Sequence, residues 1–395
     1  MIRAEVPPDR HLRVAVASHD VFWPLRGGGG IRVYWATRAL QQRGHRVTVV
    51  APFLHGRGLQ KAFPGALCLS TGRLTRFVRF KEAVYAILMI RTLRRLLGSG
   101  ADVFYAHNVV AALPAVIAGK ILKVPVIYDM DDLLTGYSKN PWVYRLGPKL
   151  EKWAARNSGT VIVPSAFGAS WCSTWGAKRI EIIRHGADLE RFRFRPRTIR
   201  GRTVVFVGGM EPNDGVLLVP RAARTVLGRF PDARFLFVGE GKALPELKRL
   251  AESLGVSDRF EFRGWVDQSR IPEILSGSAI GLITSLEVSA TTFSSPLRSY
   301  EYMAVGLPFA ASDLPGIREQ VEHSGAGLLF KPGDADRLSG VLIRLLSDGR
   351  LSARLGRNGR NYVLQNGDWN RAGLRIAEMC ESAAGWPGPG AFASS

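Results

Sequence analysis

Cysteine is scarce in this chain of 395 residues. Only Cys68, Cys172 and Cys380 occur, far apart and without the paired spacing of a disulfide framework or a zinc site. Such sparse, unpaired cysteine is typical of proteins from a reducing compartment. We therefore expect a cytoplasmic protein that folds without crosslinks.

Long hydrophobic runs are also lacking. The longest candidate, residues 83–90, is less than half of the about 18–20 apolar residues needed to span a bilayer. Residues 1–13 carry scattered charges and no apolar segment of the kind found in secretory signals. From the sequence we expect neither a transmembrane helix nor a signal peptide.

Acidic residues are few in the first half of the chain. Residues 1–197 hold 31 Lys and Arg against 12 Asp and Glu, a balance of +19, whereas the other 198 residues have a balance of only +2. A basic excess confined to one half indicates an anionic partner, either membrane headgroups or nucleic acid.

Short apolar runs alternate with helix-length segments along the whole chain, and the series restarts near residue 203. This alternation is typical of parallel sheets covered by helices on both faces. We predict an α/β protein with two doubly wound, Rossmann-like domains. The strand-like runs are residues 13–19, 47–50, 102–106, 125–128 and 161–163, then 203–207, 233–238, 260–262, 280–283 and 308–310.

The predicted boundaries follow from this series. We expect an N-terminal domain at 1–190, a charged, proline-containing linker at 191–202, and a C-terminal domain at 203–368. A helix at 369–385 would return to the N-domain, and the Gly-, Pro- and Ser-rich tail 386–395 would be disordered. Ligands of open parallel sheets bind beyond the carboxyl ends of the strands, so substrates are expected in a cleft between the domains.

A glycine cluster, residues 27–30, lies between the first strand and a helix. Glycines there let the backbone approach a ligand, and the helix N-terminus favours an anion. Gly28, Gly29 and Gly30 are candidates for a phosphate or sugar contact, and a plain flexible turn is the alternative. No acidic residue closes the second strand, so this is not a dinucleotide-binding fingerprint.

The segment from Ser294 to Pro308 carries the strongest motif. Ser295 suits a helix N-cap and Pro296 the first helical position, so that the next free amides belong to Leu297 and Arg298. With the Arg298 side chain, this helix end would form a cationic pocket for a diphosphate. Glu301 could accept hydrogen bonds from vicinal ribose hydroxyls. The alternative is a capped surface helix with an Arg298–Glu301 pair.

This segment resembles the C-domain signature of the retaining glycosyltransferases of family 4, which have the two-domain GT-B fold. The resemblance extends from about residue 13 to residue 370, because further motifs occur in the same order. They are the glycine loop with Arg32, residues 43–49, 102–107, 161–164, 185–188, 206–209, 238–241 and 262–266.

The resemblance implies a metal-independent transferase that needs no cofactor and uses a nucleotide diphosphate sugar as donor. The N-domain would lie on the acceptor side, and the C-domain would bind the nucleotide sugar. Ser295, Pro296, Leu297 and Arg298 would bind the diphosphate, and Glu301 the ribose. The other implied donor-binding residues are Gly28, Gly29, Gly30, Gly209, Gly264, Trp265 and Val266.

The chain departs from the family pattern at three places. The family often carries an Arg and a Lys around the first C-domain turn, where residues 209–214 read Gly-Met-Glu-Pro-Asn-Asp. Phe293 stands where a second glutamate is common. The fifth N-domain strand runs into residues 128–132, Tyr-Asp-Met-Asp-Asp, where the family commonly has His. Arg298 therefore remains the obvious cation for the diphosphate.

Two further N-domain groups are candidates for the chemistry. His107, at a strand end, could hydrogen-bond substrate near neutral pH, and a structural donor is the alternative. Asp131 is expected on the acceptor side, with a helix N-cap as the alternative. An Asp-x-Asp run such as Asp129-Met-Asp131 can also hold a divalent cation, a reading that the position of the phosphate motif in the other half disfavours.

Residues 73–95 combine cations with apolar side chains and suggest one or two amphipathic helices. Such helices can lie in the headgroup layer of an anionic membrane, and ordinary domain helices are the alternative. We found no nucleic-acid-binding motif in this stretch. The candidate membrane-binding residues are Arg73, Arg76, Arg79, Lys81, Arg91, Arg94 and Arg95.

Together these patterns predict a glycosyltransferase that moves a hexosyl group from a UDP- or GDP-sugar to an acceptor hydroxyl, with retention. The acceptor would be lipid-linked or a cell-envelope glycan, and the enzyme would be peripheral at the inner face of the cell membrane. Two alternatives are a sugar-nucleotide epimerase of the same fold and a non-catalytic protein that binds nucleic acid or lipid. Catalysis is expected from Arg298, Glu301, His107 and Asp131.

Overall fold

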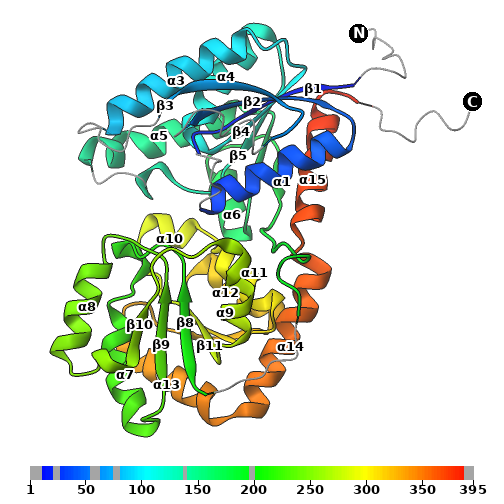
Figure 1. Ribbon diagram of the computed structural model, residues 1–395. Coiled ribbons are helices and arrows are strands. Elements are labelled where there is room, and N and C mark those ends of the chain that lie inside the picture. Colours follow the sequence, from blue (N-terminus) through cyan, green and yellow to red (C-terminus); the bar gives the residue numbers. More distant parts are fainter. Residues whose placement is uncertain are drawn as a thin grey trace, which may run out of the picture. The chain divides into compact units, whose positions relative to one another are not determined.

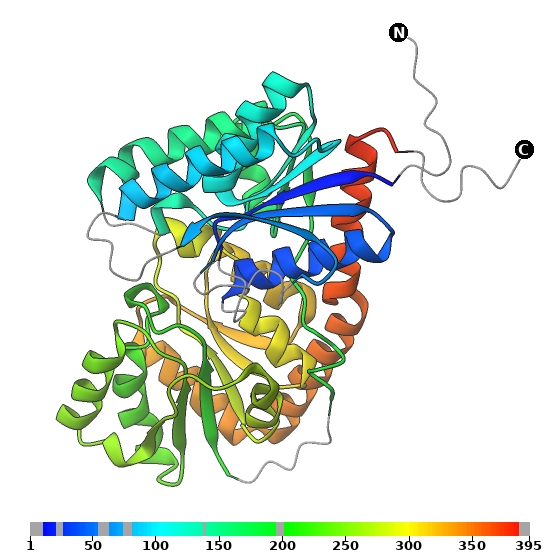
Figure 2. The same cartoon turned by 45° about the horizontal axis from the view of Figure 1, so that its top comes forward.

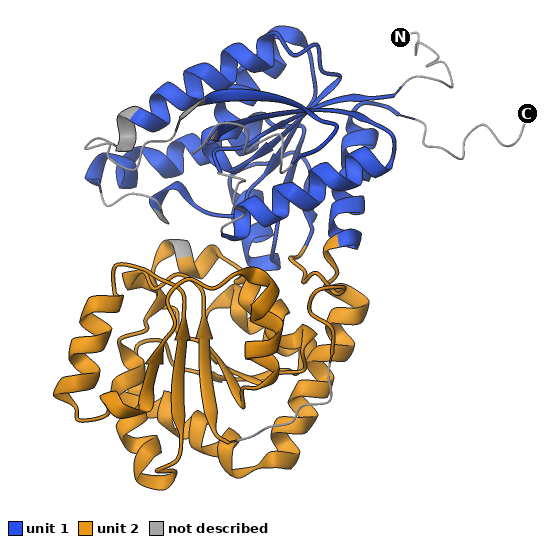
Figure 3. Ribbon diagram, in the orientation of Figure 1, with its two compact units in different colours: residues 1–183, 370–395 blue, residues 184–369 orange. Residues whose placement is uncertain are grey.

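The computed structural model describes residues 11–20, 27–53, 63–73, 81–136, 140–194 and 201–386. The chain divides into two compact units, unit 1 with residues 1–183 and 370–395, and unit 2 with residues 184–369 (Figure 3). Each unit contains one parallel sheet with helices on both faces (Figure 1). The predicted fold class, two parallel-sheet α/β domains, is confirmed.

Unit 1 is built on a seven-stranded sheet in the order β3-β2-β1-β4-β5-β6-β7. The order reverses between β1 and β4, and ligands of open parallel sheets bind beyond the carboxyl ends of the strands at such a point. The strands are β1 (Arg13–Ala17), β2 (Arg46–Phe53), β3 (Leu67–Arg73), β4 (Val103–His107), β5 (Val126–Asp129), β6 (Thr160–Val163) and β7 (Ile180–Ile182).

Helices cover both faces of this sheet, with α3 and α4 on one face and α1 and α15 on the other (Figures 1 and 2). From Asn370 onward α15 belongs to unit 1, where Glu381 accepts from Arg43 at 2.6 Å and contacts His45 at 2.8 Å. The helices are α1 (Gly28–Gln42), α3 (Lys81–Leu97), α4 (Asn108–Leu122), η1 (Leu134–Gly136), α5 (Pro141–Asn157), α6 (Ala166–Thr174) and α15 (Trp369–Ala383).

Unit 2 has a six-stranded sheet in the order β10-β9-β8-β11-β12-β13, which reverses between β8 and β11. Val204 and Phe206 point into one hydrophobic cluster and Val205 into the other, so β8 is buried on both faces. The strands are β8 (Thr203–Val207), β9 (Arg234–Val238), β10 (Phe260–Phe262), β11 (Ile280–Ile283), β12 (Phe309–Ser312) and β13 (Gly327–Phe330).

The second unit begins at Arg184, ahead of the predicted linker. Ala187 and Phe192 are buried in its core, while residues 195–200 lie outside the described part of the chain. The helices of unit 2 are η2 (Pro212–Asp214), α7 (Leu218–Arg229), α8 (Leu244–Ser253), η3 (Ser257–Arg259), η4 (Gln268–Arg270), α9 (Ile271–Ser276), α10 (Ser289–Phe293), α11 (Leu297–Ala304), α12 (Pro315–Ser324), α13 (Ala335–Ser347) and α14 (Gly349–Asn366).

The basic stretch 73–95 is not helical throughout, contrary to expectation. Arg73 is the last residue of strand β3, residues 74–80 lie outside the described residues, and the helix α3 begins at Lys81. The short polar run Leu67–Arg73 pairs in parallel with β2 at the edge of the sheet. Its apolar and polar residues gave no clear strand signal, which is why the sequence did not predict it.

A buried ion pair joins helix α1 to strand β5. The Arg32 guanidinium donates to both carboxylate oxygens of Asp129, at 2.7 and 2.9 Å, and neither side chain is exposed. The Tyr105 hydroxyl also donates to Asp129. A bidentate pair of this kind fixes both partners in orientation. It therefore sets where the N-terminal end of α1 lies against the sheet.

We expect Arg32→Met to destabilise the protein by about 3–5 kcal/mol, because it leaves Asp129 buried without its counterion. Urea unfolding followed by circular dichroism measures the loss. In the double variant Arg32→Met/Asp129→Asn no unpaired charge remains, so part of the stability should return. A single variant as stable as the natural protein would contradict this role for the pair.

Candidate active site

The predicted phosphate-binding turn lies at the start of α11 in unit 2, but the helix begins one residue later than expected. Pro296 is the N-cap, with ψ of 130°, and it has no side-chain cap. Ser295, the predicted cap, instead accepts a hydrogen bond at Oγ from the Gln320 amide. The prediction of Ser295 as N-cap is therefore wrong, because a distant side chain engages its hydroxyl.

Several bonds hold this turn in place. His185 Nδ1 donates to the Ser295 carbonyl at 2.8 Å, and Ser299 Oγ donates to Gln320 Oε1 at 2.6 Å. Farther along α11, Tyr302 donates to the Leu282 carbonyl at 3.2 Å and accepts from the Val207 amide at 3.3 Å. The N-terminal end of α11 is thus fixed beside the carboxyl ends of β8 and β11.

Arg298 is held rigidly at this helix end. Its Nη2 donates to Asp214 at 2.9 Å, and its guanidinium carbon lies 4.5 Å from the centre of the Phe206 ring. In the described part of the chain Nη1 is buried and has no hydrogen-bond partner. A buried guanidinium donor without an acceptor is costly, so this atom is a strong candidate for a ligand contact.

Glycines bring backbone segments close together beside Arg298. Gly208 has φ of +137°, and a Cβ there would lie 3.1 Å from Arg298 Nη2. Gly239 has φ of +129°, and a Cβ there would lie 2.1 Å from the Gly208 carbonyl oxygen. Its amide donates to the Gly264 carbonyl at 2.7 Å. Only glycine fits at these positions, so the loops after β8, β9 and β10 lie against one another.

Glu301 lies one turn beyond Arg298 on α11. Burial raises the pKa of its carboxyl group to about 7, although Arg298 and Arg191 act in the opposite direction. Near neutral pH the side chain is therefore divided between its neutral and its ionised form. A carboxyl group with such a pKa is typical of functional sites as well as of buried structural networks.

In unit 1, three segments meet at the carboxyl ends of β1 and β4. His107 is completely buried, with Nδ1 3.0 Å from Asp20 Oδ2 and Nε2 3.7 Å from Asp131 Oδ2. A Cβ on Gly29 would lie 2.7 Å from the His107 ring and 3.0 Å from Asp20. The glycine end of α1 therefore lies directly on the His107–Asp20 pair.

The His107 imidazole is cationic at neutral pH in this setting. Burial alone would lower its pKa, but the nearby carboxylates of Asp131 and Asp20 raise it to about 10. Asn108 follows with φ of +59°, and its side-chain oxygen accepts from the Asp131 and Asp132 amides, both at 3.0 Å. The sequence did not point to Asp20 or Asn108, because neither belongs to a motif.

The carboxylate of Asp129 is engaged in a structural ion pair. Both of its carboxylate oxygens accept from Arg32, and Tyr105 donates to it as well. Among the described residues there is no cluster of His, Cys, Asp and Glu that could hold a metal ion. The Asp-x-Asp run is thus explained by a structural ion pair at its first position.

Two family models match the chain, one for each unit. "Glycosyl transferase 4-like domain" matches residues 27–186, and "Glycosyl transferases group 1" matches residues 190–362. Together they cover most of the chain and the motifs on which the resemblance was based, apart from the second half of residues 185–188, which falls between the two matches. The chain belongs to the glycosyltransferases of the GT-B fold. As such it transfers a glycosyl group from a nucleotide sugar to an acceptor.

Curated relatives of this glycosyltransferase align over nearly the whole chain. A GDP-mannose-dependent alpha-(1-6)-phosphatidylinositol monomannoside mannosyltransferase of Mycobacterium tuberculosis is 25% identical, covering 93% of this chain and 97% of that protein. A phosphatidyl-myo-inositol mannosyltransferase of Mycolicibacterium smegmatis is 27% identical, with 91% of each chain covered. A glycogen synthase of M. tuberculosis is 24% identical, covering 93% and 94%.

Solved structures agree on the fold. Sucrose-phosphate synthase of Thermosynechococcus elongatus has a TM-score of 0.76 at 20% identity, covering 94% of this chain and 99% of that one. HepE of Anabaena in complex with UDP-glucose has a TM-score of 0.75 at 20% identity, covering 94% and 100%. Both likenesses support the GT-B architecture of the glycosyltransferase.

The first turn of unit 2 distinguishes this glycosyltransferase from the family pattern. Asp214 Oδ1 accepts a hydrogen bond from Arg298 Nη2, and Asp214 Oδ2 accepts from the Glu211 amide at 3.0 Å. Glu211 in turn pairs with Lys242 at 3.2 Å. Carboxylates thus stand where the family often has two cations. Sequence reasoning noted the missing cations but not the pairing, because residues 214 and 298 are far apart in the chain.

The remaining predicted donor residues of unit 2 lie on two of its loops. Gly209 is exposed after β8, and Gly264 has φ of +61° after β10. Trp265 is 47% exposed, whereas Val266 packs against the hydrophobic core. Both loops leave the carboxyl ends of strands of the same parallel sheet, so the structure brings these residues to the same edge of the sheet as Arg298.

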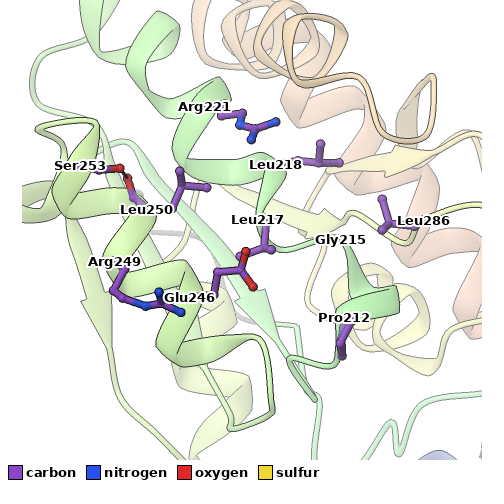
Figure 4. Close-up of a pocket in the computed structure, with 10 residues that line it drawn as sticks. All are labelled: Pro212, Gly215, Leu217, Leu218, Arg221, Glu246, Arg249, Leu250, Ser253 and Leu286. Atoms are coloured by element: carbon purple, nitrogen blue, oxygen red, sulfur yellow. Dashed lines mark hydrogen bonds between the residues drawn. The ribbon is translucent and has the colours of Figure 1, made fainter. Parts of the chain in front are cut away.

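A cavity of about 460 Å³ lies beside the first turn, between α7 and α8 (Figure 4). Four leucines supply most of its apolar wall, and Arg221, Glu246 and Arg249 are polar residues of the lining. Ser295, Arg298 and Glu301 are not among its lining residues, so the cavity and the predicted diphosphate turn are separate features. The lining residues are Pro212, Gly215, Leu217, Leu218, Arg221, Glu246, Arg249, Leu250, Ser253 and Leu286.

Of the predicted membrane-binding residues, three have described side chains. Arg94 and Arg95 are exposed on the last turn of α3, while Arg91 donates to the Thr71 carbonyl at 3.1 Å. The side chains of Arg73 and Lys81 and the whole of Arg76 and Arg79 lie outside the described part of the structure. None of the described helices is long and apolar enough to cross a bilayer.

Proposed function

We propose that the enzyme transfers a hexosyl group from a UDP- or GDP-sugar to an acceptor hydroxyl with retention of configuration. The bond between the anomeric carbon and the diphosphate breaks, a bond to the acceptor oxygen forms, and the hydroxyl proton passes to the leaving diphosphate. The observation that carries this proposal is Arg298 Nη1, a buried donor without a partner at the N-terminal end of α11.

The diphosphate would bind at this helix end. The amides of Leu297 and Arg298 and the positive end of the helix dipole favour an anion there, and the guanidinium adds a full charge. Phe206 and Gly208 fix the guanidinium before the ligand arrives. Such preorganised charges stabilise negative charge that develops on a leaving group, which is usually the largest catalytic effect.

The positions of the other predicted site residues suit further contacts with the donor and the acceptor. Glu301, when ionised, would accept from the ribose hydroxyls, and Gly264, Trp265 and Val266 would flank the base. In unit 1, Gly28–Gly30 would contact the transferred sugar and Asp131 the acceptor. His107 is buried beneath Gly29, so its positive charge would act on the substrate from behind the Gly29 backbone and without direct contact. We propose no metal, because Arg298 and the helix end supply the positive charge.

For the acceptor we propose a lipid-linked sugar or a cell-envelope glycan at the inner face of the cell membrane. Two relatives are named as mannosyltransferases acting on phosphatidylinositol derivatives, and the basic residues Arg94 and Arg95 suit an anionic surface. A same-fold epimerase would turn over nucleotide sugar without any acceptor, and a non-catalytic binding protein would turn over none.

Donor binding should strengthen as the pH rises from 6 to 8. With a pKa of about 7, Glu301 is largely protonated at pH 6 and ionised at pH 8, and only the carboxylate accepts two hydroxyl donors. Calorimetric titration with UDP- and GDP-sugars measures this change. In Glu301→Gln the pH dependence should disappear and affinity should stay at the low value. Absence of binding by every nucleotide sugar would remove the proposal.

Asp214→Asn should bind the donor several-fold more tightly than the natural enzyme. The substitution removes a negative charge that pairs with Arg298 at 2.9 Å, worth roughly 1 kcal/mol in a solvated site. Asp232→Asn is the matched control, because it breaks an exposed pair with Arg202 and should leave donor affinity unchanged. Weaker donor binding by Asp214→Asn would show that the carboxylate helps to bind the donor rather than competing with it.

Reversal of the α3 cations should weaken membrane binding. The triple variant Arg91→Glu/Arg94→Glu/Arg95→Glu should co-sediment at least tenfold less with vesicles containing phosphatidylglycerol, since each cation near an anionic surface contributes about 1 kcal/mol. Vesicles of phosphatidylcholine alone provide the control. Unchanged co-sedimentation of the triple variant would exclude α3 from the contact.

A further inference from the structure

Three helices form a continuous layer on one face of the unit 1 sheet. Helix α4 packs against α3 along one side and against α5 along the other (Figures 1 and 2). The sequence pointed only to α3 and its preceding residues as a membrane contact. The structure shows that α3 is one edge of a broader surface whose middle is α4 and whose far edge is α5.

Large apolar side chains are exposed on all three helices of this surface. On α5, Trp142, Leu146, Leu150 and Trp153 follow one another at helical spacing, and Trp142 is 64% exposed. Contiguous exposed apolar patches mark interaction sites. The exposed large apolar side chains of the three helices are Ile87, Ile90 and Leu97 on α3, Ile117, Ile121 and Leu122 on α4, and Trp142, Tyr144, Leu146, Leu150 and Trp153 on α5.

The described exposed charges of this surface are all positive. Among the side chains of α3, α4 and α5 that the structure describes, Glu151 is the only acid, and it is buried, with its carboxylate accepting from the Leu134 amide. The described exposed side chains of α3, α4 and α5 therefore carry no negative charge, while the side chain of Glu82 on α3 lies outside the described part of the structure. The exposed cations at or near these helices are Arg91, Arg94, Arg95, Lys120, Lys123, Arg145, Lys149, Lys152 and Arg156.

Cations and aromatic rings are paired on α4 and α5. Lys120 Nζ lies 5.1 Å from the centre of the Trp153 ring and donates to Asn157 at 2.6 Å. The Arg145 guanidinium lies 5.9 Å from the centre of the Trp142 ring. Rings with an apolar body and a polar edge, flanked by cations, are the side chains that concentrate at the boundary between hydrocarbon and headgroups.

We propose that the outer surface of α3, α4 and α5 docks on an anionic membrane, with Trp142 and Trp153 of α5 inserted at the headgroup level. This deepens the proposed function, since it names the surface that would bring the enzyme to a membrane-bound acceptor. The apolar stripe of α5 buries in the boundary region, while the lysines and arginines around it meet anionic headgroups. Helix α5 is thus an anchor in its own right, beside the cations of α3.

The test compares two α5 variants of the full chain with matched controls. Trp142→Ser/Trp153→Ser and Lys149→Glu/Lys152→Glu should each reduce binding to phosphatidylglycerol-containing vesicles at least tenfold in a flotation assay. Leu364→Ser, which removes an exposed apolar side chain of α14, and Arg354→Glu/Arg357→Glu, an equally spaced charge reversal on α14, should bind like the natural protein. Circular dichroism confirms that all variants are folded.

Further measurements separate this inference from the proposed function. Hydrolysis of the nucleotide sugar in the absence of vesicles should be the same in the α5 variants and in the natural enzyme, because these residues lie outside the proposed donor site. Vesicle binding that is lost in the α5 variants supports the docking surface even if no transfer is found. The docking surface is contradicted if both α5 variants bind vesicles as well as the natural protein does. It is also contradicted if the natural protein binds an oligonucleotide but no vesicles.

Discussion

The Arg32–Asp129 ion pair determines how the N-terminal unit presents its chemistry. Both side chains are excluded from solvent, so their attraction acts in a medium of low polarity. Loss of either partner would leave the other as an unpaired buried charge. Because Arg32 lies on the first turns of α1, the pair also positions Gly29 against His107. The glycine end of the helix, the cationic imidazole and the two carboxylates beside it therefore form one structural block.

Unit 2 also holds a cationic side chain in a fixed orientation, but with fewer carboxylates around it. Arg298 is packed on an aromatic ring and half satisfied by Asp214, so it is oriented without being fully neutralised. The acidic first turn means that a diphosphate would meet fewer cations than in relatives with two basic residues there. In both units a cationic side chain is held by a carboxylate from another strand–helix loop, a geometry that the common edge of parallel strands makes available.

The sequence predicted the class of fold and the family because buried strands and glycine turns leave local patterns. Ten strand-like runs led to two parallel sheets, although three edge strands were missed, β3, β7 and β13. In β3, Leu67 is exposed and the run lacks periodicity. Pairings across the chain left no such pattern. The Gln320 amide donates to the Ser295 hydroxyl, and Asp20 pairs with His107. Neither contact could be predicted from residue spacing.

Asn108 shows how narrowly one position can be constrained. Its backbone adopts the left-handed conformation, and its side-chain oxygen receives two amide hydrogens from the segment after β5. Glycine would keep the backbone but lose the acceptor, and most other side chains would resist the conformation. Aspartate would meet both demands only by adding charge beside Asp131. Asparagine thus meets both the backbone and the hydrogen-bond demand without added charge, so few substitutions should be tolerated at this position.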